Sequence, residues 1–185
     1  SHSDQIEQWQ TSVPHSRSGI GWAGRMMDLI KDINPGQAVS MNISMDGSNV
    51  FQSGVTGAEY AVNPGNSQQE GGAVALAGYA ADYDSNNGVA NAAGAAMDGM
   101  LAQQYSHLLQ DTWQRKRRTA QEAYALYSSA TAGTLPGNIV FPNTSLGRQL
   151  KQVCKAIMGR NSLGALRQTF FVNRGGWDHH SDTLL

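Results

Sequence analysis

The chain has 185 residues, 40% of them hydrophobic, so it is long enough for one domain with a buried core and short for two. Its 13 basic and 14 acidic side chains give a net charge of −1, which excludes the strongly basic surface expected of a general nucleic-acid or anionic-membrane binder. The single cysteine, Cys154, excludes an intrachain disulfide. No run of roughly eighteen apolar residues occurs, so we expect no membrane-spanning helix.

Two helices are predicted near the amino terminus. The first covers about residues 3–10, where Ser3 or Asp4 can act as the N-cap. The second runs from about Gly21 to Ile33 and ends before Pro35. Its predicted buried face consists of apolar residues at helical spacing. These are Trp22, Met26, Leu29, Ile30 and Ile33.

Short strands are predicted next. Residues 38–45 alternate apolar and polar side chains, the pattern of a strand with one buried face. Residues 46–49, "DGSN", form a predicted turn, and strand-like runs follow at 50–54 and 59–63. From residue 64 to 94 the chain is rich in Gly, Asn and Ser, which predicts a loop with a possible helical start near 74–81.

One long helix is predicted over residues 91–130, stopped by Gly133 and Pro136. The basic run at 115–118, "RKRR", lies in this helix. A solvated helix face explains it better than a nucleic-acid patch, because the run is short and isolated.

The last predicted unit is a helix over residues 144–160 followed by a strand over 169–172. Thr144 or Ser145 can cap the helix, and Cys154 should turn inward with Leu150, Val153 and Ile157. The strand does not alternate, which is typical of a strand buried on both faces in a parallel sheet. The chain therefore reads as α/β: a parallel sheet flanked by helices, with a small β-rich segment and one long helix.

The stretch "RGGWDHHSD" after this strand is the main candidate site. In open α/β sheets, functional groups gather beyond the carboxyl ends of parallel strands. Asp178 and His180 lie two residues apart and project to the same side of an extended segment, and their oxygen and nitrogen atoms suit Zn²⁺, Mn²⁺ or a related ion. Two ligands do not complete a site. The alternative is a polar turn in which Asp178 caps a following helix.

A second candidate lies in the opening "SHSD". Ser1 stands at a helix start, where free backbone amides and the helix dipole stabilise an anion, so its hydroxyl could accept a phosphoryl or sulfuryl group. On the residues alone, simple capping of the helix is the favoured interpretation.

Four stretches, in order, resemble the domain of unknown function 1501 family. They are "SHSDQIEQWQTS", "GWAGRMMDL", "FPNTSLGRQLKQVCKAI" and "RQTFFVNRGGWDHHSD". The resemblance spans nearly the whole chain, and "GGWDHHS" is its most specific part. Members of this family are mostly bacterial, are often exported through the twin-arginine pathway, and are grouped with the alkaline phosphatase and sulfatase superfamily.

The resemblance implies a partial alkaline-phosphatase-like fold with a divalent metal centre, of Zn, Mn, Mg or Ca, at the strand ends. Asp178 and His180 fall on the Asp and His of the family motif and are implied as metal ligands, with His179 third. Ser1 falls on the serine of the family's Ser-His segment and is implied as a catalytic nucleophile. A periplasmic or secreted location is implied as well.

The chain departs from the family pattern at both ends. It lacks the upstream strand with its Asp-bearing turn and the downstream Ser-Asp-Phe-Gly-Arg-like segment, so we expect residues 1–185 to be a single incomplete domain that is inactive alone. Two functions are expected for the complete protein. One is hydrolysis of a small-molecule or polymer ester of phosphate or sulfate. The alternative is a non-catalytic exported binding protein, favoured by the Gly/Asn/Ser-rich segment from Pro64 to Asn91.

Overall fold

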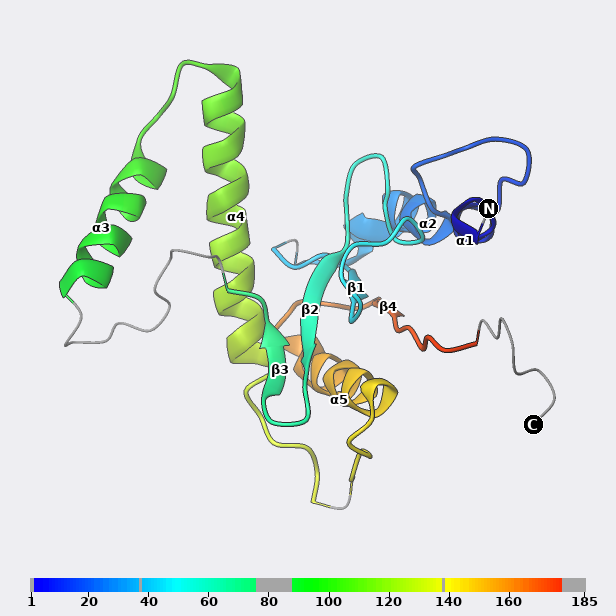
Figure 1. Ribbon diagram of the computed structural model, residues 1–185. Helices are drawn as coiled ribbons and strands as arrows, with labels where there is room; N and C mark the ends of the chain where they lie inside the picture. Colours follow the sequence, from blue (N-terminus) through cyan, green and yellow to red (C-terminus); the bar gives the residue numbers. More distant parts are fainter. Residues whose placement is uncertain (1, 37, 76–87, 138, 178–185) are drawn as a thin grey trace.

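The computed structural model describes residues 2–36, 38–75, 88–137 and 139–177. These residues form a four-stranded sheet of order β3-β2-β1-β4 with helices packed against it (Figure 1). Strand β1 (Asn42–Ser44) pairs in parallel with β2 (Tyr60–Gly65) and with β4 (Thr169–Phe171), while β3 (Glu70–Ala73) pairs antiparallel with β2. The predicted α/β class, with a mostly parallel sheet flanked by helices, is confirmed.

The helices occupy both faces of the sheet. Their bounds are α1 His2–Thr11, α2 Trp22–Ile30, α3 Gly88–Ala102, α4 Leu108–Ala130 and α5 Ser145–Met158, with 3₁₀ turns η1 Lys31–Ile33 and η2 Gly159–Asn161. On one face, the Asn42 side chain reaches the Ala23 carbonyl of α2. On the other, Ile43 packs with Tyr127 of α4 and Ala156 of α5. Among the described residues, no helix is long and apolar enough to cross a membrane.

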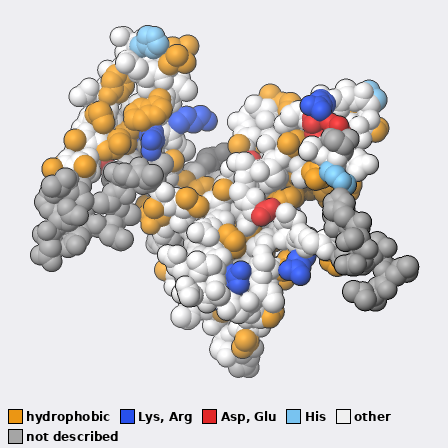
Figure 2. Space-filling view, in the orientation of Figure 1, with side chains coloured by type: hydrophobic (Ala, Val, Ile, Leu, Met, Phe, Trp, Pro, Cys, Tyr) orange, Lys and Arg blue, Asp and Glu red, His pale blue; other side chains and the backbone are white. Residues whose placement is uncertain are grey.

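The prediction of one long helix over residues 91–130 is wrong, because this stretch forms two helices. The chain leaves helical structure after Ala102, and α3 folds back against α4 to form an arm that extends from the sheet (Figure 1). Gln114 and Arg118 of α4 donate hydrogen bonds to the carbonyl of Leu101, which satisfies the end of α3, and the Leu101 side chain is buried. Hydrophobic side chains gather on the surface of this arm (Figure 2), among them the exposed Leu108.

The N-cap predicted for α1 is wrong, and the N-cap predicted for α5 is confirmed. Helix α1 begins at His2, so Ser3 and Asp4 lie in its first turn rather than at its N-cap, and Asp4 pairs instead with Arg17. At α5, Thr144 is the N-cap, and its hydroxyl accepts a hydrogen bond from the Gly147 amide at 3.1 Å.

The apolar face predicted for α2 is also wrong. The buried residues of α2 are Ala23, Gly24 and Met27, whereas Leu29 is 85% exposed. The small residues face inward because α2 lies directly against the backbone of the following loop: the Gly24 amide donates to the Phe51 carbonyl at 3.1 Å. A larger side chain on this face would hold the helix away from that loop.

Helix α5 buries two amide side chains, and of its predicted apolar stripe only Val153 packs against the core cluster, beside the fully buried Ala156. Gln149 and Gln152 are buried, while Leu150 and Ile157 are 39% and 40% exposed. Cys154 is half-buried, not a core residue as predicted. The helix takes this orientation because Gln149 forms hydrogen bonds with the backbone that follows β4.

Strand β1 is buried on both faces, so the prediction of a half-buried strand is wrong. Asn42 and Ser44 are as fully buried as Ile43. The predicted strand at 50–54 is a turn and loop, and this loop covers the polar face of β1 through Gln52, whose side-chain amide donates to the Ile43 carbonyl at 3.3 Å. Strand β3 lies within the segment that was predicted to be loop.

Substituting Gly24 with Ala is expected to lower the free energy of unfolding by about 1–3 kcal/mol. A Cβ at this position would lie 1.9 Å from the Ser53 carbonyl oxygen, so α2 and the loop would have to separate. Gly99→Ala is the matched control, since nothing lies within 4 Å of its Cβ position in α3 and removing a helical glycine should stabilise by about 0.5–1 kcal/mol. Urea unfolding of both variants measures the difference. Equal stability of the two would contradict the close packing.

Candidate functional site

The carboxyl ends of β1 and β4 lie side by side because the strands are parallel and Ser44 pairs with Phe171. The pairing continues one step further, where the Met45 amide donates to the Phe171 carbonyl at 2.9 Å. Just beyond, the exposed Asp46 carboxylate accepts a hydrogen bond from the Asn173 side-chain amide at 2.8 Å. This edge of the sheet therefore presents a carboxylate and an amide from two strand ends.

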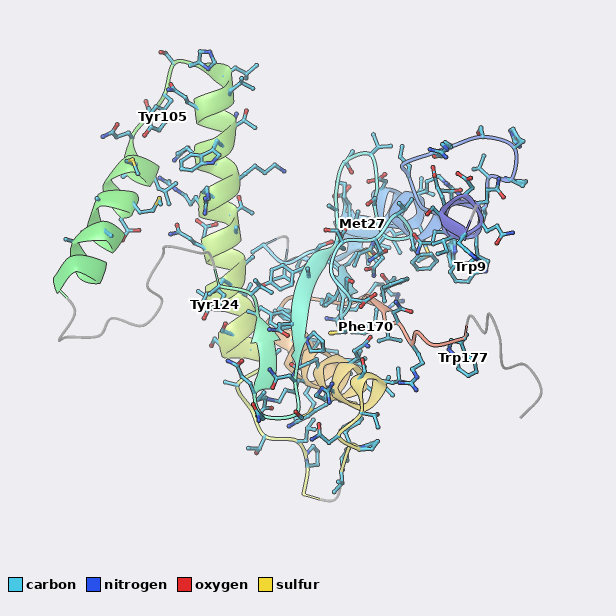
Figure 3. All side chains as sticks on the ribbon, viewed as in Figure 1. Trp9, Met27, Tyr105, Tyr124, Phe170 and Trp177 are labelled. Carbon is cyan, nitrogen blue, oxygen red and sulfur yellow. The ribbon has the colours of Figure 1, made fainter. Side chains whose placement is uncertain are left out.

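Asn173 is held by its backbone as well as by its side chain. The buried Gln149 of α5 donates to the Asn173 carbonyl at 2.8 Å and accepts from the Asn173 amide at 2.8 Å. These two bonds fix the chain as it leaves β4. It then passes through Gly176, whose φ of +88° favours glycine, to Trp177, which is 77% exposed (Figure 3).

The chain leaving β1 is fixed by a second polar network. The Ser44 hydroxyl accepts from the Asp46 amide and from the Asn49 side chain, both at 3.2 Å. Asn49 in turn accepts from the Gln52 amide at 2.9 Å. Sequence reasoning missed Asp46 because it treated the residue as part of a turn. The signal that identifies it is a carboxylate directly after a strand whose neighbours are parallel.

The residues predicted to form the site, Ser1, Asp178, His179 and His180, lie outside the described residues. The structure describes the segments that adjoin them. Helix α1, which begins at His2, is joined to the end of β4 by a row of aromatic rings.

In this row, Trp9 of α1 stacks on Phe51 with ring centroids 6.1 Å apart, and Phe51 contacts Phe171 at 5.8 Å. Trp22 of α2 meets the same Phe51 ring edge-on at 5.0 Å. Figure 3 shows Trp9 and Trp177 on the same side of the molecule. The segments next to both predicted motifs thus adjoin one side of the sheet.

Another charged cluster is structural. Glu70 of β3 accepts from Lys155 at 2.7 Å and pairs with Lys151 at 3.0 Å. The hydrogen bonds from Lys155 and then Lys151 hold the pKa of Glu70 below its ordinary value. This cluster ties β3 to α5, and Glu70 pairs with Gly65 at the carboxyl end of β2.

The described strand ends do not form a metal site by themselves. Within residues 2–36, 38–75, 88–137 and 139–177, no group of three or more His, Cys, Asp or Glu side chains is close enough to hold a metal ion. The Asp46 carboxylate is a hard oxygen ligand that could join other donors at this edge. Compared with protein-family models, curated proteins and solved structures, the chain has no match.

Proposed function

We propose that this chain is the central part of an exported, metal-dependent hydrolase of phosphate or sulfate esters with an alkaline-phosphatase-like fold. The observation that carries the proposal is the parallel pair β1 and β4, whose adjoining carboxyl ends bear Asp46 and Asn173 and lead within a few residues to "GGWDHHSD". Parallel strand ends of this kind are where α/β enzymes place their catalytic groups. The family resemblance supplies the reaction class, by analogy.

An open sheet edge supports the view that the domain extends further. Strand β4 ends the sheet and no described strand pairs with its outer side. Its residues Thr169–Phe171 carry no proline, lysine or bulge to discourage pairing, the usual protections of a true edge. We therefore propose that a further strand of the complete protein pairs with β4 and brings additional ligands to the site.

The proposed roles follow the sequence motifs. Asp178 and His180 would hold a divalent ion, with His179 as a third candidate ligand, and Asp46 adds a hard oxygen at the same edge. Such an ion, when bound, polarises an ester oxygen. The Ser1 hydroxyl oxygen would attack the phosphorus or sulfur atom, the bond to the ester oxygen would break, and the alcohol would leave with the proton that Ser1 gives up; water would then release phosphate or sulfate from Ser1. The free amides at the start of α1 would stabilise the negative charge. Gln149 positions the segment through its two hydrogen bonds to Asn173.

Metal content tests the proposal. A version of the protein extended at both ends should bind roughly one or more divalent ions per chain, and a variant carrying Asp178→Ala with His180→Ala should lose them. Inductively coupled plasma mass spectrometry of both proteins measures the ions directly. The matched control carries Asp32→Ala with His15→Ala, which removes the same residue types outside the proposed site and should keep the metal.

Esterase assays on the same extended protein complete the test. Hydrolysis of a nitrophenyl phosphate or sulfate that is abolished by Ser1→Ala would support the proposed nucleophile. If the variant with Asp178→Ala and His180→Ala kept its metal, the assignment of these two residues as metal ligands would be refuted. Metal binding without any ester turnover would favour the alternative function, a non-catalytic exported binding protein.

A further inference from the structure

A cleft of about 420 Å³ lies at the end of the sheet opposite to the strand ends described above. Its walls include the segments that precede β1 and β2, namely residues 38–41 and 56–60, together with the end of α2 and one side of α4. The volume is within the range of small-molecule sites in proteins. Because these segments enter the parallel strands rather than leave them, the cleft is separate from Asp46 and Asn173.

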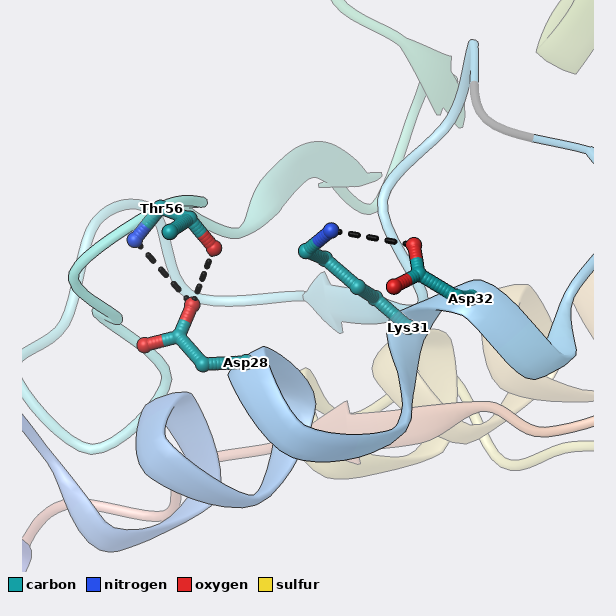
Figure 4. Close-up of polar contacts among 4 residues, drawn as sticks. All are labelled: Asp28, Lys31, Asp32 and Thr56. Atoms are coloured by element: carbon teal, nitrogen blue, oxygen red, sulfur yellow. Dashed lines mark hydrogen bonds and ion pairs between the residues drawn. The ribbon is translucent and has the colours of Figure 1, made fainter.

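One wall of the cleft is fixed by the Asp28 carboxylate (Figure 4). It accepts hydrogen bonds from the Val55 amide at 2.6 Å, from the Thr56 hydroxyl at 2.6 Å and from the Thr56 amide at 3.1 Å. The bond from the Thr56 hydroxyl, followed by the bond from the Val55 amide, holds the pKa of Asp28 below its ordinary value. The next residue, Gly57, lies so close to Met27 that a Cβ would be 2.8 Å from its methyl group. The wall is therefore formed before any ligand arrives.

Groups of opposite charge line the cleft. One carboxylate oxygen of Glu59, Oε2, is buried without a hydrogen-bond partner. A buried acceptor without a partner is unfavourable, and a donor from a ligand that reached this oxygen would satisfy it. Lys116 of α4 and Lys31 also line the cleft, and Lys31 pairs with Asp32. Lys116 is exposed and available to an anion.

Apolar side chains make up most of the remaining lining. They include Met27, Val39, Met41, Val74 and Ala120. A ligand that fits all three features has a donor for Glu59, an anionic group for Lys116 and an apolar side group that packs against the rest of the lining. We propose that this cleft binds a small zwitterion of the apolar amino-acid class, whose ammonium group donates to Glu59 and whose carboxylate meets Lys116.

Titration calorimetry of the full chain with three related probes tests this assignment. The probes are L-leucine, 4-methylpentanoate, which lacks the amine, and 3-methylbutylamine, which lacks the carboxylate. Leucine should bind with a dissociation constant about 10-fold lower than either partial probe, because each partial probe loses one charge-assisted contact. No saturable binding of leucine, or equal binding of the three probes, would overturn the proposal.

Two variants assign the two ends of the ligand. Glu59→Gln should weaken leucine about 10-fold and leave 4-methylpentanoate unchanged, since that probe has no amine to lose. Lys116→Gln should weaken leucine and leave 3-methylbutylamine unchanged. Glu122→Gln and Arg160→Gln make the same chemical changes at exposed positions outside the cleft and should bind leucine normally. Leucine affinity that is unchanged by Glu59→Gln would refute the role of that carboxylate.

Discussion

Tyr127→Ala is expected to lower the free energy of unfolding by about 3–5 kcal/mol, the range for removing a large ring from a protein core. Tyr127 is fully buried and belongs to the cluster that joins α4 and α5 to the sheet. Its ring packs on Tyr60 at the start of β2, with centroids 5.1 Å apart. The cavity left by alanine would separate α4 from the sheet. Chemical unfolding followed by circular dichroism measures the loss.

Tyr127→Phe is expected to raise the free energy of unfolding. It serves as the control because it keeps the aromatic ring and removes only the hydroxyl. The Tyr127 hydroxyl is buried with no hydrogen-bond partner, and burial raises the pKa of this phenol above its ordinary value. Removing an unsatisfied polar group while keeping the ring should stabilise the protein by about 1 kcal/mol. A clear destabilisation by Tyr127→Phe would mean that the hydroxyl has a partner, for example an ordered water.

Asn42→Ala is expected to destabilise the protein by about 3–4 kcal/mol, because one buried amide serves three other segments. Its nitrogen donates to the Gln52 carbonyl at 3.0 Å and to the Ala23 carbonyl at 3.4 Å, and its oxygen accepts from the Thr169 hydroxyl at 2.6 Å. Alanine would leave all three buried partners without this contact. Unfolding in urea, with an unchanged slope, would give the loss directly.

A double-mutant cycle separates this network from simple loss of volume. Thr169→Val keeps the size of the side chain and removes the hydroxyl that bonds Asn42. In the Asn42→Ala background this second change should cost less than in the parent protein, with a coupling of about 1 kcal/mol. Strictly additive effects would show that Asn42 and Thr169 do not act together.

The parts of the fold that the sequence predicted correctly depend on local chemistry. Thr144 caps α5 because its hydroxyl reaches an amide three residues on, a contact that needs no other segment. The wrong predictions concern places where contacts with residues distant in sequence determine which side chains are buried and where a helix ends. The polar face of β1 is buried because Gln52 and Thr169 bond to it, and α3 breaks from α4 because Gln114 of α4 bonds to the last turn of α3.

The location of the candidate site stays a prediction, since Ser1 and residues 178–180 lie outside the described residues. The strand expected at 169–172 is present as β4, and the α/β pattern was enough to predict it because strand ends follow from that pattern. Asp46 could not be found in this way, since nothing in "DGSN" indicates that it would meet Asn173 more than a hundred residues later. The hydrogen bonds between the Gln149 side chain and Asn173 could not be predicted either, because a glutamine in an amphipathic helix normally faces water.

The pairing of β1 with β4 has a consequence for the order in which the protein is made. Asn42 and its partner Thr169 are separated by 127 positions, whereas β2 and β3 are neighbours along the chain. At usual rates of translation, roughly 6–25 s pass between the synthesis of the two partners. During that interval the β2–β3 hairpin can form, but one side of β1 is unpaired and the Asn42 side-chain oxygen lacks its hydrogen bond from Thr169. The nascent chain is therefore more exposed to aggregation and proteolysis before β4 emerges from the ribosome than after β4 has paired with β1.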